Sequence, residues 1–452
     1  MNQVYEVGQK LNINIKNIGI NGEGIGYYEK MAIFVDQTLP NENVDVEITE
    51  VYHNRIVAKK VNILKESAYR VKPFCPIYDK CGGCQLQHLD SSEVAKTKRN
   101  IVLDAYQRYT HRNLPKDIVE NTITAENEKG YRHKVSLPVR FTGKNHVGMY
   151  EAGTRNFIQM DACPIHHPAL NEVVAIILDL MNQYGIKGYD EKYKKGHVLT
   201  LIARISTLNE IQVTFVIQKN HSKYIELAKD LMKKDKRVVS VFKVFDRKGQ
   251  KVGFFNDSLR KIKGKDTIDE NLGGYKFSLT PEAFFQLNPI QAHRFYTEMV
   301  KLAGLRRFHT AIDAYAGSAP ISHYIAHACK KVYAIEVDAK SCESAKLSLE
   351  KNDIKNVVVL QSTFKRALSG LQKKKIDVMF FDPPRTGLGK ETIDLILKSR
   401  PKRIVYGSCN PSTLAKDLNL LLKAYKLEVT KPLDMFPQTS LVESISLLTL
   451  KS

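Results

Sequence analysis

The chain has 452 residues, a length that predicts about three domains. Its 69 lysines and arginines outnumber its 48 aspartates and glutamates, and the net charge of +21 favours a polyanionic partner over a small free substrate. The sequence contains no signal peptide, apolar membrane-spanning run, repeat or low-complexity tract, so we expect a cytoplasmic protein without a membrane association.

Residues 1–64 alternate apolar and polar positions in short runs, which predicts β-strands exposed on one face. The runs are Leu11–Ile15, Met31–Val35, Val44–Ile48 and Ile56–Ala58, with a bend or bulge at Gly22–Gly26. These strands fit a five-stranded OB-like barrel, a fold that is widely used on RNA.

A cysteine loop follows, in which Cys75, Cys81 and Cys84 have the spacing C-x5-C-x2-C. Cys163 could supply a fourth thiolate. Three thiols so close together do not suit a secretory disulfide framework, so they predict a metal site. Four cysteines can bind tetrahedral zinc or an iron–sulfur cluster, and the spacing does not distinguish between the two.

The middle of the chain, residues 65–269, predicts an α+β domain that also carries the cysteine loop. Expected strands are Lys134–Arg140, Val198–Ala203, Ile211–Ile217 and Val238–Phe242, and expected helices are Asn171–Tyr184 and Tyr224–Lys233. A further helix is expected over Glu93–Tyr109.

Residues 270–452 alternate strands with helices, the pattern of a parallel, doubly wound sheet. The expected strands are His309–Ala314, Lys331–Glu336, Asn356–Leu360, Ile376–Phe381, Arg403–Tyr406, Leu427–Thr430 and Ile445–Leu450. The expected helices are Ala339–Asn352 and Thr392–Ser399. This is the Rossmann-like arrangement of an α/β domain.

Three of these strands end on residues that can do chemistry. Glu336 ends the second strand, where a carboxylate commonly accepts from ribose hydroxyls, and Asp382 and Cys409 follow two later strands. Because parallel strands bring their carboxyl ends to one edge, the carboxylate and the thiol should be neighbours. The edge looks like a site for S-adenosylmethionine.

Five ordered motifs resemble those of the RNA uracil-5 methyltransferase family. They are Phe284-Phe-Gln286-Leu-Asn288, Asp313-Ala-Tyr315, Asp382-Pro-Pro-Arg385-Thr-Gly-Leu, Ser408-Cys409-Asn-Pro-Ser-Thr-Leu and Asp434-Met-Phe-Pro-Gln-Thr-Ser-Leu-Val-Glu443. The resemblance implies that Gln286, Tyr315, Glu336 and Asp382 hold S-adenosylmethionine. It also implies that Cys409 is the nucleophile and Glu443 the base.

The resemblance extends over the whole chain and implies its organisation. Residues 1–64 resemble a TRAM domain, residues 65–269 the central domain and residues 270–452 a class I methyltransferase domain, with residues 92–120 packing against the catalytic part. Many members carry a [4Fe-4S] cluster on this cysteine pattern, which favours a cluster over zinc. The cluster pattern and the TRAM-like segment favour 23S ribosomal RNA as substrate, with transfer RNA second, for a monomeric enzyme of rRNA processing.

Two local features distinguish this chain from other methyltransferases. Arg385 follows Asp-Pro-Pro, where enzymes that methylate exocyclic amino groups carry an aromatic residue, so uracil carbon 5 is the better prediction. The turn after the first catalytic strand carries Ala319 and Pro320, where the family usually has a glycine-rich sequence. A methyl at residue 319 would crowd the turn if the backbone needs a positive φ there. The competing interpretation is therefore a non-catalytic RNA-binding protein on a degenerate methyltransferase scaffold.

Overall fold

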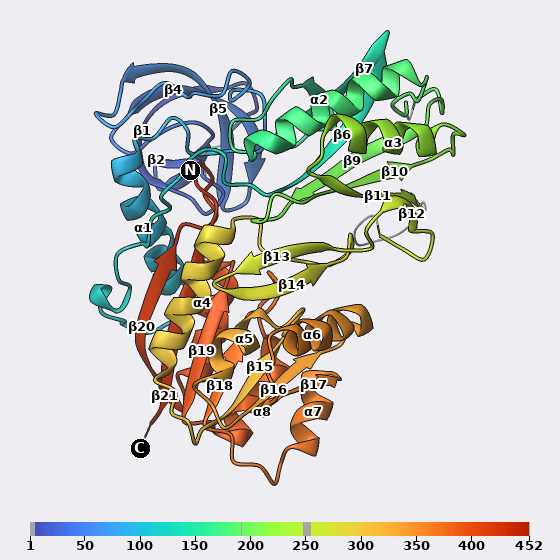
Figure 1. The fold of residues 1–452 in the computed structure, drawn as a ribbon. Helices are drawn as coiled ribbons and strands as arrows, with labels where there is room; N and C mark the ends of the chain where they lie inside the picture. The colour runs from blue at the N-terminus through green and yellow to red at the C-terminus, as the bar shows by residue number, and fades with distance from the viewer. Residues whose placement is uncertain (1–4, 191, 247–254, 452) are drawn as a thin grey trace. The chain divides into compact units, whose positions relative to one another are not determined.

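The computed structural model describes residues 5–190, 192–246 and 255–451 (Figure 1). They form two compact units, each built from several stretches of the chain. Unit 1 comprises the described residues of Met1–Glu126, Pro384–Ile393 and Ser408–Ser446, and unit 2 those of Asn127–Pro383, Asp394–Gly407 and Leu447–Ser452. No helix within the described ranges is both long enough and apolar enough to cross a membrane.

Unit 1 begins with a closed barrel in the strand order β1-β2-β3-β5-β4, which confirms the predicted barrel. The strands are β1 (Lys10–Ile18), β2 (Gly24–Tyr28), β3 (Met31–Val35), β4 (Asn43–Tyr52) and β5 (Arg55–Lys65). Every second side chain of β1 from Leu11 to Ile15 is buried in the barrel core with Ile33, Val46 and Ile56. Alternation of period two therefore produces the barrel directly.

The rest of unit 1 is built around helix α1 (Ser91–Tyr109), which the Asp90 side chain caps by accepting from the Ser92 amide. The helix contacts α9 (Pro411–Leu421) and β20 (Tyr425–Leu433). A short 3-10 helix, η1 (Lys116–Ile118), follows α1 and contacts β20. Residues close to the N-terminus thus pack against residues more than three hundred positions later in the chain, as the Tyr106–Thr430 hydrogen bond illustrates.

Unit 2 contains a mixed sheet in the order β12-β11-β10-β9-β6-β7-β8. Its strands are β6 (Lys134–Thr142), β7 (Lys144–Tyr150), β8 (Phe157–Gln159), β9 (Val198–Ile205), β10 (Ile211–Ile217), β11 (Val238–Phe245) and β12 (Arg260–Gly264). Helices α2 (Pro168–Gln183) and α3 (Tyr224–Lys234) contact this sheet and each other. The hairpin β13 (Ile268–Leu272) and β14 (Tyr275–Leu279) forms a separate two-stranded sheet.

The second large sheet has the order β17-β16-β15-β18-β19-β21-β20. Its strands are β15 (Thr310–Ala314), β16 (Lys331–Glu336), β17 (Val357–Gln361), β18 (Val378–Phe381), β19 (Arg403–Ser408), β20 and β21 (Glu443–Leu450). The associated helices are α4 (Pro289–Ala303), α5 (Pro320–Ala326), α6 (Ala339–Lys351), α7 (Phe364–Gly370), α8 (Gly389–Ser399) and α9.

Strands β15 to β19 are parallel, and the order reverses direction between β15 and β18. Such a reversal creates the crevice in which doubly wound sheets bind their ligands. The α/β class I methyltransferase fold that the sequence predicts is therefore confirmed.

Candidate active site

Three carboxylates lie at the carboxyl ends of adjacent parallel strands in unit 2. Asp313 is the penultimate residue of β15, Glu336 ends β16 and Asp382 directly follows β18. The pairing places Ala314 opposite both Ile335 and Phe381, so the three strand ends are level. The reversal of strand order thus coincides with a concentration of negative charge.

Burial shifts the protonation of two of these groups. It raises the pKa of Asp313 to about 7, with additional effects from the carboxylates of Asp382 and Glu336, because like charges disfavour ionisation. Burial also raises the pKa of Asp382 to about 6. Perturbed carboxylates at a strand-end crevice are typical of a ligand site.

Glu336 is held in place by backbone amides. One of its oxygens accepts from the amides of Val337 and Asp338 at 2.7 and 2.9 Å, and the other accepts from the amide of Gly317 at 2.9 Å. The carboxylate therefore joins the end of β16 to the turn that follows β15.

That turn has a left-handed backbone at three places. Tyr315, Gly317 and Ala319 have φ values of 62°, 55° and 61°, and glycine is the residue that adopts this region without a steric penalty. Ala319 is the N-cap of α5, with Pro320 in the first helical turn, where proline is tolerated. The positive φ considered for residue 319 is thus present in the structure.

Gln286 reaches the same acidic region through a tyrosine on α4. Its side chain hydrogen-bonds Tyr296, whose pKa is raised well above the ordinary value by burial and by the nearby carboxylates of Asp382 and Asp313. The four predicted cofactor residues, Gln286, Tyr315, Glu336 and Asp382, all belong to unit 2.

Cys409 belongs to unit 1, where its half-buried thiol lines a cavity of about 120 Å³. The cavity is also lined by Ile20, Asn21, Arg385, Asn410, Pro411, Ser440, Leu441 and Val442. Val442 directly precedes Glu443, the first residue of β21, whose side chain is buried. The predicted nucleophile and the segment that carries the predicted base therefore border one cavity.

Hydrogen bonds fix the turn that presents Cys409. The Asn410 side chain caps α9 by accepting from the Ser412 amide at 3.0 Å and donates to the Arg385 carbonyl at 3.3 Å. Thr413 donates to the same carbonyl at 3.2 Å. The Ser-Cys-Asn-Pro and Pro-Pro-Arg motifs are thus joined through one carbonyl oxygen.

Comparison with known proteins identifies the family. The profile of the tRNA (uracil-5-)-methyltransferase family matches residues 104–451, and the profile of the TRAM domain matches residues 5–61. The chain belongs to the tRNA (uracil-5-)-methyltransferase family. Membership makes it an RNA methyltransferase, which decides against the non-catalytic alternative.

Its relatives include bacterial proteins that align with it over almost their whole length. An uncharacterized RNA methyltransferase of Bacillus anthracis is 36% identical, covering 99% of this chain and 98% of the relative. One from Listeria monocytogenes is also 36% identical, with complete coverage of both chains. Among solved structures, the Pyrococcus abyssi tRNA (uracil-54, C5)-methyltransferase in complex with S-adenosyl-L-homocysteine has the same fold, with a TM-score of 0.77 and 23% identity, covering 97% of this chain and 100% of that one.

The described part of this RNA methyltransferase does not assemble the predicted metal site. Among the residues described, no group of three or more His, Cys, Asp and Glu side chains lies close enough to hold a metal ion. Cys75, Cys81 and Cys84 are half-buried in unit 1, and the loop is closed by backbone hydrogen bonds, such as Cys81 to Ile77 at 2.9 Å. Cys163 belongs to unit 2.

Several cations in the basic runs Lys96–Arg99 and Arg132–Lys134 are engaged by other parts of the protein. Lys98 is fully buried, and Arg99 donates to the carbonyls of Val119 and Lys116 at 2.8 and 2.7 Å. Burial lowers the pKa of Lys134 to about 7. The runs Lys96–Arg99 and Arg132–Lys134 therefore offer fewer cations to RNA than the sequence suggests, because a run of charges does not show which side chains point inward.

Sequence reasoning also missed residues that the structure places at the site. Tyr296 gave no signal beyond being an aromatic residue in a helix. Asp313 and Asp434 stood inside quoted motifs without an assigned role, and their burial, to 0% and 4% exposure, identifies them as internal polar groups.

Proposed function

We propose that this enzyme transfers a methyl group from S-adenosylmethionine to carbon 5 of uridine in RNA, through a covalent adduct to Cys409. The observation that supports this most directly is the cavity in unit 1, lined by Cys409 on one side and by Ser440–Val442, next to Glu443, on another. A nucleophile in the cavity wall and a base directly after that wall in the chain suit a reaction in which both act on a single ring.

The chemistry needs both groups because carbon 5 of uracil is too weak a nucleophile to take a methyl group unaided. The Cys409 thiolate forms a bond to carbon 6, and the electron pair of the 5,6 double bond moves into the ring as an enolate. The enolate's electron pair at carbon 5 would then form a bond to the methyl group while the bond from that methyl to the sulfonium breaks, so that S-adenosylhomocysteine leaves. Glu443 removes the proton left on carbon 5, the double bond re-forms, and the carbon–sulfur bond breaks to return the thiolate.

We propose that the acidic strand ends of unit 2 hold the cofactor, which supplies an electrophilic methyl group on a sulfonium. Glu336 suits ribose hydroxyls, because a carboxylate at the end of the second strand is the usual acceptor. Asp382, Gln286 and Tyr315 would complete the site. The hydrogen bonds from backbone amides to Glu336 support a preorganised acceptor at this position.

We propose 23S ribosomal RNA as the substrate, modified by a monomer in the cytoplasm. The TRAM domain and the cysteine pattern support this choice, because transfer RNA enzymes of the family commonly lack both. Transfer RNA is the second candidate, since the Pyrococcus abyssi protein with the same fold acts on a tRNA uracil.

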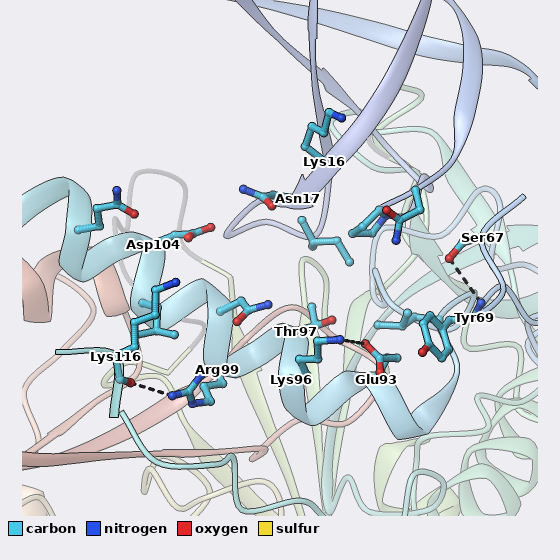
Figure 2. Close-up of a pocket in the computed structure, with 17 residues that line it drawn as sticks. Lys16, Asn17, Ser67, Tyr69, Glu93, Lys96, Thr97, Arg99, Asp104 and Lys116 are labelled. Atoms are coloured by element: carbon cyan, nitrogen blue, oxygen red, sulfur yellow. Dashed lines mark hydrogen bonds and ion pairs between the residues drawn. The ribbon is translucent and has the colours of Figure 1, made fainter. Parts of the chain in front are cut away.

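A basic pocket of unit 1 supports RNA binding beyond the target base. It has a volume of about 480 Å³ and lies between the barrel and α1 (Figure 2). Lys16 of β1 and Lys116 of η1 border it, together with Tyr69, whose ring offers a stacking surface. We propose that this pocket takes phosphate and base groups of the bound RNA.

We also propose that Cys75, Cys81, Cys84 and Cys163 hold a [4Fe-4S] cluster, with zinc as the alternative. The spacing of the thiols supports a metal site at these residues. Uracil methylation has no redox step, so the role of the cluster would be structural or RNA-orienting.

The test is single-turnover methylation with the full-length protein. Cys409→Ser should abolish turnover and leave cofactor binding near wild type, since a hydroxyl is a far weaker nucleophile than a thiolate. Wild-type protein should form a stable adduct with 5-fluorouridine RNA, because fluorine cannot leave as a proton. Turnover by Cys409→Ser near the wild-type rate would refute the covalent route. Mapping 5-methyluridine in ribosomal and transfer RNA, with and without the gene, would decide the substrate.

A further inference from the structure

The loop that leads to Glu443 is held from two sides within unit 1. Residues 434–442 connect β20 to β21, and we call them the base loop. From one side, the amides of Gln85 and Leu86 both donate to the Gln438 carbonyl at 3.0 Å. From the other side, Lys98 of α1 enters the loop with a side chain that is fully buried.

The Lys98 ammonium makes three hydrogen bonds, all to the base loop. It donates to the Asp434 carboxylate at 2.5 Å, to the Leu441 carbonyl at 2.8 Å and to the Phe436 carbonyl at 3.2 Å. An ammonium has three donors, so this arrangement uses its full capacity. One side chain thereby ties both ends of the base loop together.

The same helix also holds the strand that carries Glu443. Tyr106, two turns after Lys98, shares a hydroxyl contact with Thr430 of β20 at 2.7 Å and with Ser446 of β21 at 3.3 Å. Glu443 lies between Leu441, which Lys98 binds, and Ser446, which Tyr106 binds. Helix α1 therefore fixes the chain on both sides of Glu443.

Burying a lysine ammonium costs desolvation free energy unless its charge is balanced. The presence of Lys98 at this position therefore needs an explanation other than packing. Burial lowers the pKa of Lys98, whereas Asp434 and Glu443 act in the opposite direction by stabilising its charge. The ammonium is thus electrostatically coupled to the proposed base as well as bonded to its loop.

We propose that Lys98 is a positioning residue for Glu443, holding the base loop at the Cys409 cavity and keeping the Glu443 carboxylate ionised. This inference rests on the proposed role of Glu443 as the base. It assigns to an N-terminal helix, distant in sequence, a function in the last chemical step.

The first test replaces Lys98 by methionine, which has a similar length but no charge and no donor. In single turnover, the methylated protein–RNA adduct should form, whereas its resolution into free product should slow by about 100-fold, the effect typical of a displaced reacting group. Lys423→Met, at an exposed lysine following α9, is the matched control and should resolve the adduct at the wild-type rate.

The second test uses the double variant Lys98→Met/Asp434→Asn, which removes both charges and leaves no unpaired buried carboxylate at Asp434. The acid limb of the pH profile for adduct resolution should move to higher pH in Lys98→Met, because a carboxylate that has lost a nearby ammonium takes up a proton more readily. It should move back toward the wild-type limb in the double variant, which also loses the Asp434 carboxylate. The charged groups coupled to the Lys98 ammonium are Asp434 and Glu443, and only Glu443 is left ionisable in the double variant.

The outcomes separate this inference from the proposed function. If wild-type protein forms no adduct at all, the covalent route fails first. If wild type resolves its adduct and folded Lys98→Met or the double variant does so equally fast, with an unchanged pH profile, the role of Lys98 is refuted. Failure of both variants to reach the wild-type circular dichroism spectrum would also refute it, because the pair would then serve folding rather than the base.

Discussion

The Asp313 carboxylate accepts two hydrogen bonds from Ser322 through a single oxygen. The Ser322 amide donates to Oδ2 at 2.9 Å and its hydroxyl donates to the same atom at 2.6 Å. The other oxygen, Oδ1, is buried and has no hydrogen-bond partner among the described residues. A buried acceptor without a hydrogen-bond partner costs folding free energy. Its position at a strand-end crevice therefore points to a ligand that donates to it.

The first prediction concerns the pH dependence of stability without cofactor. The pKa of Asp313 rises from 3.8 to about 7 on folding, so the native state binds this proton more tightly than the unfolded state. Its stabilising contribution is therefore complete at low pH and is lost as the pH rises toward 7. Asp313→Asn cannot ionise, so from pH 5 to pH 8 its free energy of unfolding should gain about 2 to 3 kcal/mol relative to wild type.

Urea unfolding of both cofactor-free proteins at the two pH values measures this difference. An identical gap between variant and wild type at pH 5 and pH 8 would show that Asp313 does not titrate in this range. In the same variant, the affinity for S-adenosylmethionine should fall, since the amide cannot offer the same charged acceptor.

The second prediction concerns the turn after β15. Ala319 and Ala316 are buried in the same small cluster, but only Ala319 has a positive φ. Changing either to glycine loses a buried methyl group and increases the entropy of the unfolded chain, whereas only Ala319→Gly relieves left-handed strain of about 1 to 2 kcal/mol. Thermal denaturation should therefore find Ala316→Gly less stable than Ala319→Gly by about that amount. Equal losses would mean that Ala319 is not strained.

Much of the fold could be predicted from local pattern alone. The expected strands Met31–Val35 and Ile211–Ile217 coincide with β3 and β10, and the helix expected over Glu93–Tyr109 is α1. Alternating or continuous apolar runs and a capped helix are local sequence patterns. They can be recognised without knowing which other parts of the chain these elements contact.

Some strands that the structure contains were not predicted from the sequence. The hairpin of β13 and β14 turns at Gly273-Gly274, and both glycines have a positive φ. Two consecutive glycines between strands are a sequence signal for a hairpin. Strand β7 carries the buried Asn145, which bonds Asn182 and the Ile186 carbonyl, so its polar residues are satisfied by tertiary contacts.

In the candidate site, too, residues marked by a local sequence pattern could be predicted, whereas residues defined by contacts distant in sequence could not. Acidic residues at strand ends could be found by pattern, because the parallel sheet places them predictably. Lys98 could not, since its partner Asp434 is 336 positions away and its surroundings in sequence are those of a solvated basic run.

The third prediction tests RNA binding by the pocket of unit 1. Lys16→Gln and Lys116→Gln should each weaken RNA binding and reduce the dependence of log affinity on log salt by about one, as expected for one phosphate contact. Lys355→Gln, at an exposed lysine outside this pocket, is the control. Filter binding at several salt concentrations provides the measurement, and unchanged slopes would exclude phosphate contacts by these lysines.

Point substitutions suit this question better than removal of residues 1–64. Ile18 and Leu39 from this segment share a core with Leu86, Leu89 and Val94. Deleting the barrel would expose that core, so a loss of RNA affinity could then arise from unfolding rather than from a lost contact.

The fourth prediction concerns the cysteine loop. Protein purified without oxygen should be brown and contain about four iron and four sulfide per chain. Cys81→Ser should remove the colour, whereas Cys342→Ser, at a buried cysteine of α6, should retain it. Colourless wild-type protein with one zinc would instead assign the loop to a zinc site.

The last prediction separates methyl transfer from resolution of the adduct. Glu443→Gln preserves the shape of the side chain but removes the base, so thiolate addition and methyl transfer can proceed while the proton on carbon 5 remains. A methylated protein–RNA adduct should accumulate, detectable by gel shift under denaturing conditions and by mass spectrometry. Its formation should require both Cys409 and S-adenosylmethionine, so Cys409→Ser/Glu443→Gln is the control. Because Glu443 begins β21 beside the cavity-lining Val442, this substitution changes the base without altering the cavity wall itself. Turnover of Glu443→Gln at the wild-type rate would require another residue to be the base.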